Sequence, residues 1–125
     1  MARAAPPPSR VVLVVEDEPF QRLMAIDMLE DAGFEVEAVG DADAAVEILA
    51  RRADIRVVFT DIDMPGGIDG MKLAAMIRDR WPPIQLILTS GHFAAANVTM
   101  PAESVFFTKP YRQRDVVATM RRLTA

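Results

Sequence analysis

Four apolar segments of the sequence end in residues that could carry out chemistry. The first is followed by a pair of acids, the next ends in a single acid, and the last two lead to a hydroxyl group and a lysine. In chain order these residues are Glu16, Asp17, Asp61, Ser90 and Lys109. Three carboxylates brought together would repel one another unless a cation joined them. Carboxylate oxygens are ligands that Mg²⁺ prefers, so this set predicts a magnesium site.

The same residues predict phosphoryl chemistry. A carboxylate beside a divalent cation can attack phosphorus as a nucleophile, because the cation screens its charge from the incoming group. Lys109 would hold one phosphoryl oxygen, and the Ser90 hydroxyl would donate to another. Lys109 is one of only two lysines in the chain, and it stands before a proline. No member of the set is an obvious base for rapid hydrolysis, so we expect a site that accepts a phosphoryl group and retains it.

Composition narrows the classes of function. The 125 residues include no cysteine and one histidine, His92. This excludes disulfide scaffolds and thiol catalysis, and it argues against multi-histidine metal sites and Ser/His/Asp triads. The net charge of −4 argues against direct nucleic-acid binding, which positive charge usually drives. Because no apolar run approaches the ~20 residues of a membrane span, we expect a cytoplasmic protein that does not contact the membrane.

Alternating strand and helix patterns position these residues. Short runs rich in β-branched residues predict five strands, at 11–15, 35–39, 55–60, 84–89 and 105–108. Helical spacing of apolar residues predicts helices from Pro19 to Gly33, after the N-cap Asp41, near 71–78 and 93–98, and from Pro110 onward. The apolar stripe of the first helix is Met24, Ala25, Met28, Leu29 and Ala32, and that of the last is Val116, Met120 and Leu123. Five strands alternating with five helices imply an α/β fold with a parallel sheet.

The predicted fold brings the chemically active residues together. In open parallel sheets, functional groups gather at the carboxyl ends of the strands. Each active residue ends or follows a predicted strand, so we expect one cluster at that edge of the sheet. Residues 1–10 contain three consecutive prolines and nothing that could build a core, which predicts a disordered, proline-rich tail. A single domain is expected over residues 11–125.

Four stretches of the sequence together resemble the response regulator receiver domains of two-component signalling. They are Val-Val-Glu-Asp-Glu (14–18), Phe-Thr-Asp-Ile-Asp-Met-Pro-Gly (59–66), Leu-Thr-Ser-Gly (88–91) and Phe-Phe-Thr-Lys-Pro-Tyr (106–111). They occur in the order and on the elements of that family. The resemblance covers nearly everything from Arg10 to Leu123 and indicates the single-domain type. It implies a flavodoxin-like (βα)5 doubly wound fold with a five-stranded parallel sheet.

The resemblance also implies roles for the acids and the lysine. Asp61 would be the phosphoacceptor, and Lys109 matches the lysine of the family. Asp17 and Asp61 would bind Mg²⁺ directly. Glu16 would bind it through water, and Asp63 through its backbone carbonyl. The phosphoryl donor would be a histidine kinase or a histidine phosphotransfer protein, and the output would pass to a downstream protein effector.

A signalling switch is implied by the same resemblance. Ser90 matches the hydroxyl residue that turns toward the phosphoryl group, and Phe106 occupies the aromatic switch position. Alternation along the strand lets only one of Thr89 and Ser90 face the site. The small residue Gly91 after Ser90 favours Ser90.

Some features depart from the common family pattern. The first acid is Glu16 where aspartate is commoner, and the loop 65–70 carries one extra residue. The segment 91–105, on the face that usually carries output, is short and alanine-rich for a full helix. Asp63 and His92 are candidates for tuning the access of water to the site.

The first helix carries a second apolar line, formed by Phe20, Leu23 and Ile26, away from its core stripe. This line could pack partly against the last helix. Alternatively, it could dock a helical bundle that donates the phosphoryl group.

Two enzyme classes share parts of the pattern. Glu16 with Asp61-Ile-Asp63 imitates the acids of Toprim-like nucleotidyl-transfer domains, but the acidic charge and the Lys109-Pro110 pair argue against that class. Haloacid-dehalogenase-like phosphatases also use Asp-x-Asp, usually on the first strand of their core. A degenerate receiver that acts only as a scaffold conflicts with the complete acid, hydroxyl and lysine set. We therefore predict a Mg²⁺-dependent phosphoacceptor module that promotes its own phosphorylation and is not a multiple-turnover enzyme.

Overall fold

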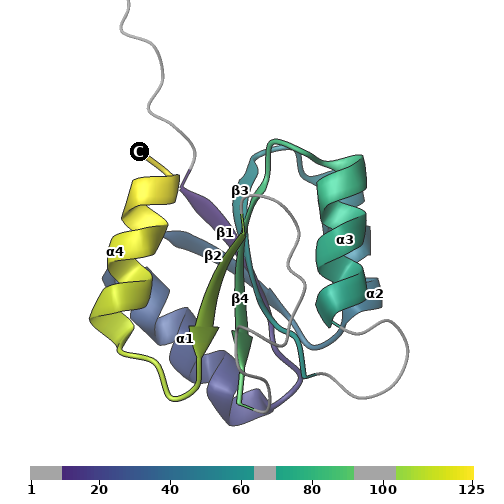
Figure 1. Ribbon diagram of the computed structural model, residues 1–125. Coiled ribbons are helices and arrows are strands. Elements are labelled where there is room, and N and C mark those ends of the chain that lie inside the picture. Colours follow the sequence, from purple (N-terminus) through teal and green to yellow (C-terminus); the bar gives the residue numbers. More distant parts are fainter. Residues whose placement is uncertain (1–9, 64–69, 92–103) are drawn as a thin grey trace, which may run out of the picture.

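A computed structural model of the chain describes residues 10–63, 70–91 and 104–125. These residues form one five-stranded parallel sheet in the order β2-β1-β3-β4-β5 (Figure 1). The strands are β1 (Val11–Val15), β2 (Glu35–Val39), β3 (Ile55–Asp61), β4 (Gln85–Ser90) and β5 (Ser104–Thr108). The sheet predicted from the sequence is thereby confirmed, with strand ends that differ by one residue in β3, β4 and β5.

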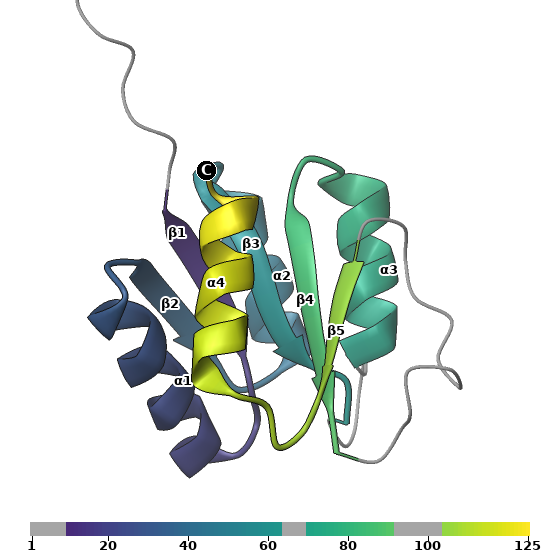
Figure 2. The ribbon, with the colours of Figure 1, turned by 60° about the vertical axis from the view of Figure 1, so that its left-hand side comes forward.

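Helices cover both faces of the sheet. The described helices are α1 (Pro19–Asp31), α2 (Ala42–Arg51), α3 (Gly70–Arg80) and α4 (Gln113–Leu123). Figure 2 shows α1 and α4 on one face, with α2 and α3 behind the sheet. The fifth predicted helix, at 93–98, lies outside the described residues, as does most of the predicted tail. In the described part of the chain, no helix is long and apolar enough to cross a membrane.

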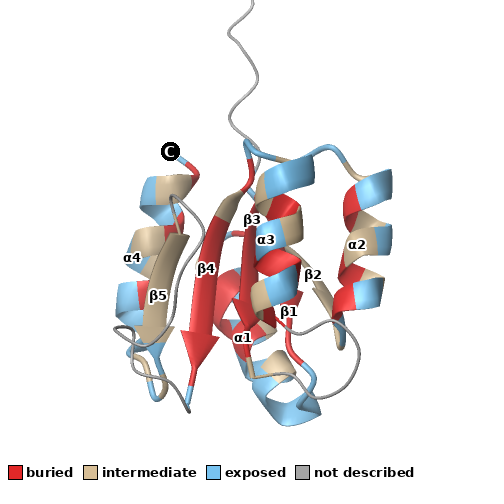
Figure 3. Ribbon diagram, turned by 45° about the vertical axis from the view of Figure 1, so that its right-hand side comes forward, coloured by how far each residue is buried: buried red, intermediate tan, exposed pale blue. Residues whose placement is uncertain are grey.

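The three central strands are buried on both faces, as Figure 3 shows in red for much of their length. In β1, Val12 and Val14 pack toward α1 and α4, whereas Leu13 and Val15 pack toward α2 and α3. This two-sided burial is why the strand is a continuous apolar run rather than an alternating one. It holds the carboxyl ends of β1, β3 and β4 in a rigid row.

Polar caps fix the helix starts beside the strand ends. The Glu18 carboxylate accepts hydrogen bonds from the backbone N–H groups of Phe20 and Gln21, at 3.0 and 2.7 Å, and so begins α1. Asp41 accepts from the Ala44 N–H at 2.8 Å, which confirms the predicted cap of α2. Gly33, with φ of 94°, turns the chain from α1 toward β2, a backbone conformation that favours glycine.

Two helix predictions were wrong in detail. The last helix begins at Gln113 rather than Pro110, since its N-cap residue Arg112 has an extended backbone, with φ of −85° and ψ of 127°. The preceding Tyr111 packs its ring edge-on against Phe59, with 5.9 Å between ring centroids. Met24 is 45% exposed, although the helical spacing placed it in the core stripe. Its neighbours Ala25, Met28 and Leu29 fill the contact with the sheet and leave Met24 at the rim.

Candidate functional site

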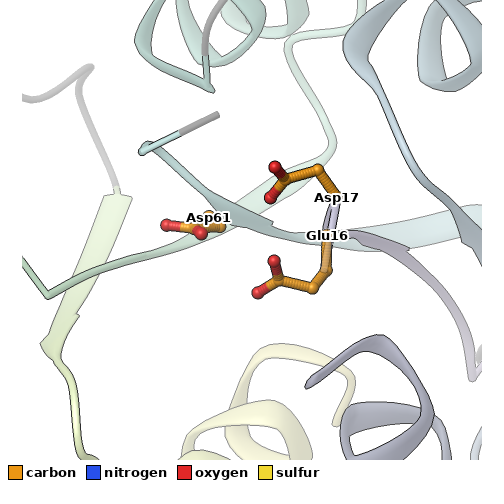
Figure 4. Close-up of side chains that lie close together, drawn as sticks. All are labelled: Glu16, Asp17 and Asp61. Carbon is orange, nitrogen blue, oxygen red and sulfur yellow. The ribbon is translucent and has the colours of Figure 1, made fainter. Parts of the chain in front are cut away.

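Three acids meet at the carboxyl edge of the sheet. Glu16 and Asp17 follow β1, and Asp61 is the last residue of the neighbouring strand β3. One carboxylate oxygen from each of the three lies within 4.8 Å of the others, and the side chains extend to the same side of the strand ends (Figure 4). Glu16 and Asp61 are each only 7% exposed, whereas Asp17 faces solvent. The predicted clustering of these acids is therefore present in the fold.

Lys109 lies directly against two of these acids. Its ammonium donates to Asp61 Oδ2 at 3.2 Å, to Glu16 Oε1 at 3.1 Å and to Gln21 Oε1 at 2.7 Å. Burial alone would lower the pKa of Lys109, but attraction to Asp61 and Glu16 outweighs it and raises the pKa above its usual value. The lysine is therefore a permanent positive charge whose three hydrogens all have acceptors.

Glu16 occupies the most desolvated position of the cluster. Burial raises its pKa above the usual value, and this effect outweighs the hydrogen bond from the Glu18 N–H and the attraction of Lys109. Arg22 donates to the Glu16 backbone carbonyl at 2.9 Å, which fixes the turn after β1. Loss of solvent around Glu16 therefore decides the direction of its pKa shift, even with Lys109 in contact.

Asp63 links the phosphoacceptor candidate to the end of β4. Its backbone N–H donates to Asp61 Oδ1 at 3.0 Å. Its carboxylate accepts from the Ser90 hydroxyl, at 2.9 Å to Oδ1 and 2.8 Å to Oδ2, and from the Gly91 N–H at 2.9 Å. Ser90 thus reaches the acidic side of the site, whereas Thr89 lines a separate cavity beside it.

The site is an acidic hollow of about 280 Å³. It is lined by Glu16, Asp17, Glu18, Gln21, Asp61, Asp63, Gly91 and Lys109. Its carboxylate oxygens are hard donors of the kind that suits Mg²⁺, and Asp17 leaves the cluster open to solvent, so the residues fit the predicted ion. A larger, mainly apolar cavity of about 380 Å³ adjoins the hollow. Residues of α1 and the Lys109–Gln113 segment line it together with the sheet.

The remaining predicted residues lie farther from the acids or outside the description. Phe106, on β5, is partly buried against the core under α2 and α3. It pairs in register with Leu88, two residues before Ser90. His92 and the residues 64–69, which include most of the loop with the extra residue, lie outside the described part of the chain.

Sequence reasoning missed two residues of the site. Gln21 was not singled out, because nothing in a helical first turn signals a side chain that reaches a lysine 88 residues away. Gly70 begins α3, and a Cβ there would overlap the backbone of Asp61 and Ile62. The only sequence signal for Gly70 is a glycine at the end of a loop. The structure shows that the first residue of α3 lies directly against the Asp61 backbone.

Comparisons with known proteins agree with this geometry. The chain is 35% identical over 113 residues to the response regulator protein FleR of Pseudomonas aeruginosa, covering 86% of this chain and 24% of FleR. It is 32% identical over 95 residues to the sensor protein TorS of Escherichia coli, covering 76% of this chain and 10% of TorS. The chain therefore spans a quarter or less of the length of these relatives.

The fold has close structural counterparts. A response regulator receiver protein from Sinorhizobium medicae is 30% identical, with a TM-score of 0.82 and coverage of 93% of this chain and 94% of that one. These likenesses confirm the flavodoxin-like fold and do not favour the Toprim-like or dehalogenase-like alternatives. The family model of the response regulator receiver domain matches residues 12–121. The chain belongs to the response regulator receiver domain family of two-component signalling.

Proposed function

We propose that the chain accepts a phosphoryl group on Asp61 from a histidine kinase or histidine phosphotransfer protein and signals by contact with a downstream protein. Receiver domains are generally signalling modules rather than enzymes. The observation that carries the proposal is the place of the Asp61 carboxylate, which is buried, accepts from the Lys109 ammonium and lies within reach of one ion together with Glu16 and Asp17. That arrangement supplies a nucleophile, a fixed cation and metal-binding oxygens within one hollow.

The chemistry follows from the atoms around Asp61. An Asp61 oxygen forms a bond to phosphorus while the phosphorus–nitrogen bond of the donor phosphohistidine breaks. The electron pair of that bond stays on the ring nitrogen, and because the phosphorylated ring is protonated on its other nitrogen, it leaves as neutral imidazole. The Asp63 N–H and the Lys109 ammonium already bind one Asp61 oxygen each, so the carboxylate is held in place. Lys109 then donates one of its three hydrogen bonds to a phosphoryl oxygen in place of its present acceptor. The domain thus promotes its own phosphorylation.

The acids would hold the cofactor in this scheme. Asp17 and Asp61 would bind Mg²⁺ directly, Glu16 through water and Asp63 through its backbone carbonyl. When bound, Mg²⁺ neutralises charge on the transferring phosphoryl group. Support comes from the three carboxylates that lie within reach of one ion and from Lys109, which pairs with two of them and leaves negative charge for a cation to neutralise.

The output would run through Ser90 and Phe106. Ser90 ends β4 beside the hollow, and Phe106 lies on the adjacent strand β5, against the core under α2 and α3. A change in the Ser90 hydroxyl can therefore reach Phe106 through neighbouring strands. We place this signalling in the cytoplasm, as is usual for the family, and propose a protein as the receiving partner.

The exposed start of α1 is the proposed docking surface for the donor. Phe20 is 67% and Leu23 53% exposed, and Met24 lies beside them. Ile26, predicted as part of this line, is partly buried. Gln21 and Lys109 lie next to this surface at the entrance to the hollow. An apolar patch at the rim of a charged site suits a helical bundle that presents a phosphohistidine.

Phosphorylation by a small donor tests the proposal. We expect acetyl phosphate with Mg²⁺ to form a base-labile adduct, detected by intact-mass spectrometry. Asp61→Asn should abolish the adduct. Asp54→Asn, which changes an exposed acid at the other end of the sheet, is the matched control and should keep it. An adduct that survives in Asp61→Asn, or multiple-turnover phosphatase or nuclease activity, would contradict the proposal.

A further inference from the structure

The Asp63 carboxylate accepts hydrogen bonds from Ser90, the last residue of β4, and from Gly91, which follows it. Both of its oxygens lie within 2.9 Å of the Ser90 hydroxyl oxygen, and Oδ2 also accepts from the Gly91 N–H. Ser90 is fully buried, so its hydroxyl has no access to bulk solvent. Hydrogen bonds from a hydroxyl to an ionised carboxylate are among the stronger ones in proteins. The Ser90 hydroxyl is therefore held in a defined orientation before any phosphoryl group arrives.

We propose that Asp63 is a positioning residue that holds the Ser90 hydroxyl away from Asp61 in the unphosphorylated domain. This inference rests on the proposed function, because it concerns the hydroxyl that would respond to phosphorylation. A hydroxyl has one hydrogen, which cannot make a strong bond to the Asp63 carboxylate and to a phosphoryl oxygen at the same time. A phosphoryl group on Asp61 must therefore take this hydrogen from Asp63.

The backbone places the two competing acceptors close together. The Asp63 N–H donates to Asp61 Oδ1, so the Asp63 carboxylate projects from a residue that is itself bonded to the phosphoacceptor. The Gly91 N–H adds a second donor to Asp63 and keeps the carboxylate at the end of β4. The strength of the Ser90–Asp63 hydrogen bond would thus set how readily the Ser90 hydroxyl turns to a phosphoryl group on Asp61. Asp63 would do this without touching the phosphoryl group.

The test is the binding of beryllofluoride with Mg²⁺, which imitates a phosphoryl group on a carboxylate. Asp63→Asn keeps the size of the side chain but removes its charge and one acceptor oxygen. It should tighten beryllofluoride binding about tenfold, the equivalent of about 1.4 kcal/mol. In a Ser90→Ala background the same substitution should change the affinity less than about twofold, because no hydroxyl is left to release.

Comparing the effect of Asp63→Asn with Ser90 present and with Ser90→Ala separates positioning from simple charge repulsion. Asp63 is negative and near the site, so its removal could favour an anion without involving Ser90. Equal tightening in the Ser90 and Ser90→Ala proteins would show repulsion and overturn the proposal. No tightening in the Ser90 background, or weaker binding, would overturn it as well.

A second measurement needs neither metal nor phosphoryl group. In the metal-free protein, Asp63→Ala should move the Gly91 amide proton upfield in an NMR spectrum, because its carboxylate acceptor is lost. Asp17→Asn, which changes an exposed acid of the same cluster, is the control and should leave this resonance in place. A Gly91 resonance unmoved by Asp63→Ala would contradict the hydrogen bonding.

If the wild-type chain forms no adduct with acetyl phosphate, the proposed function fails. If the adduct forms but the effect of Asp63→Asn does not depend on the Ser90 hydroxyl, only this inference fails.

Discussion

In the part of the chain that the structure describes, two clusters each bring one cation against several acids, and they lie at opposite ends of the sheet. At the carboxyl end, Lys109 pairs with Glu16 and Asp61. At the amino end, Arg52 pairs with Glu35, Glu37 and Asp54 at 2.7–3.0 Å. Both clusters hold more negative than positive charge, and the hydrogen bonds of the Arg52 cluster are the shorter ones on average. Bond length therefore does not distinguish the chemical site from the structural one.

Burial separates the two clusters. The acid side chains around Lys109 are 7–9% exposed, whereas those around Arg52 are 42–65% exposed. Water and salt screen the exposed cluster, so its excess negative charge has little effect on anything nearby. The buried cluster cannot dissipate its charge in this way. Its acids therefore favour a bound cation, which is the condition for bringing a phosphoryl group to Asp61.

Replacing the cationic side chain of each cluster should give the largest difference between the clusters, measured as the rate of adduct formation. Lys109→Met should slow adduct formation from acetyl phosphate by about a hundredfold, because one fixed donor to the phosphoryl oxygens is lost. Arg52→Met is the matched change and should leave the rate within about twofold. The rates are measured by intact mass against time. A similar rate for Lys109→Met and wild type would remove Lys109 from the chemistry.

The backbone under the buried cluster should tolerate less change than the backbone elsewhere. Gly70→Ala places a methyl group against the Asp61 and Ile62 backbone, so we expect it to lower the free energy of unfolding by about 3 kcal/mol or more. Gly33→Ala meets no neighbour and carries only the penalty of its positive φ, about 1–2 kcal/mol. Urea denaturation measures both. A Gly70→Ala protein that is no less stable than Gly33→Ala would show that the start of α3 moves away from Asp61 at little cost.

The fold and the position of the site could be predicted from the sequence because both depend on local patterns. Two-faced burial produces the apolar runs of the central strands, and the residues after those runs meet by topology alone. Contacts across the fold leave no such pattern. The Gln21–Lys109 and Asp63–Ser90 hydrogen bonds depend on which way a side chain points. The contact of the Tyr111 ring with Phe59, just before α4, depends on side-chain packing in the same way.

The exposed start of α1 should matter for transfer from a protein donor but not for the chemistry. Phe20→Ala with Leu23→Ala should slow transfer from a histidine phosphotransfer donor about tenfold, because the apolar contact area is lost. Labelling by acetyl phosphate should be unchanged, which is the internal control. Equal slowing with both donors would indicate damage to the site. Unchanged transfer from the protein donor would place docking elsewhere.

The smallest expected effect concerns pH: the stability contributions of an acid from each cluster should change with pH in opposite directions. Burial raises the pKa of Glu16 in the folded state, so its contribution to stability is greatest at low pH and is lost as pH rises through that pKa. The hydrogen bond from Arg52 lowers the pKa of Asp54, so its contribution is present at neutral pH and is lost as pH falls.

Denaturation of metal-free protein between about pH 4 and pH 7, across the usual range of carboxyl groups, tests this difference. Relative to wild type, Glu16→Gln should become more stable as pH rises, because the uncharged side chain avoids the desolvation of an ionised one and can still accept from Lys109. Asp54→Asn should become less stable relative to wild type over the same range. Slopes of the same sign would mean that burial does not separate the two clusters, and that the excess charge at the phosphoacceptor is screened as fully as the charge around Arg52.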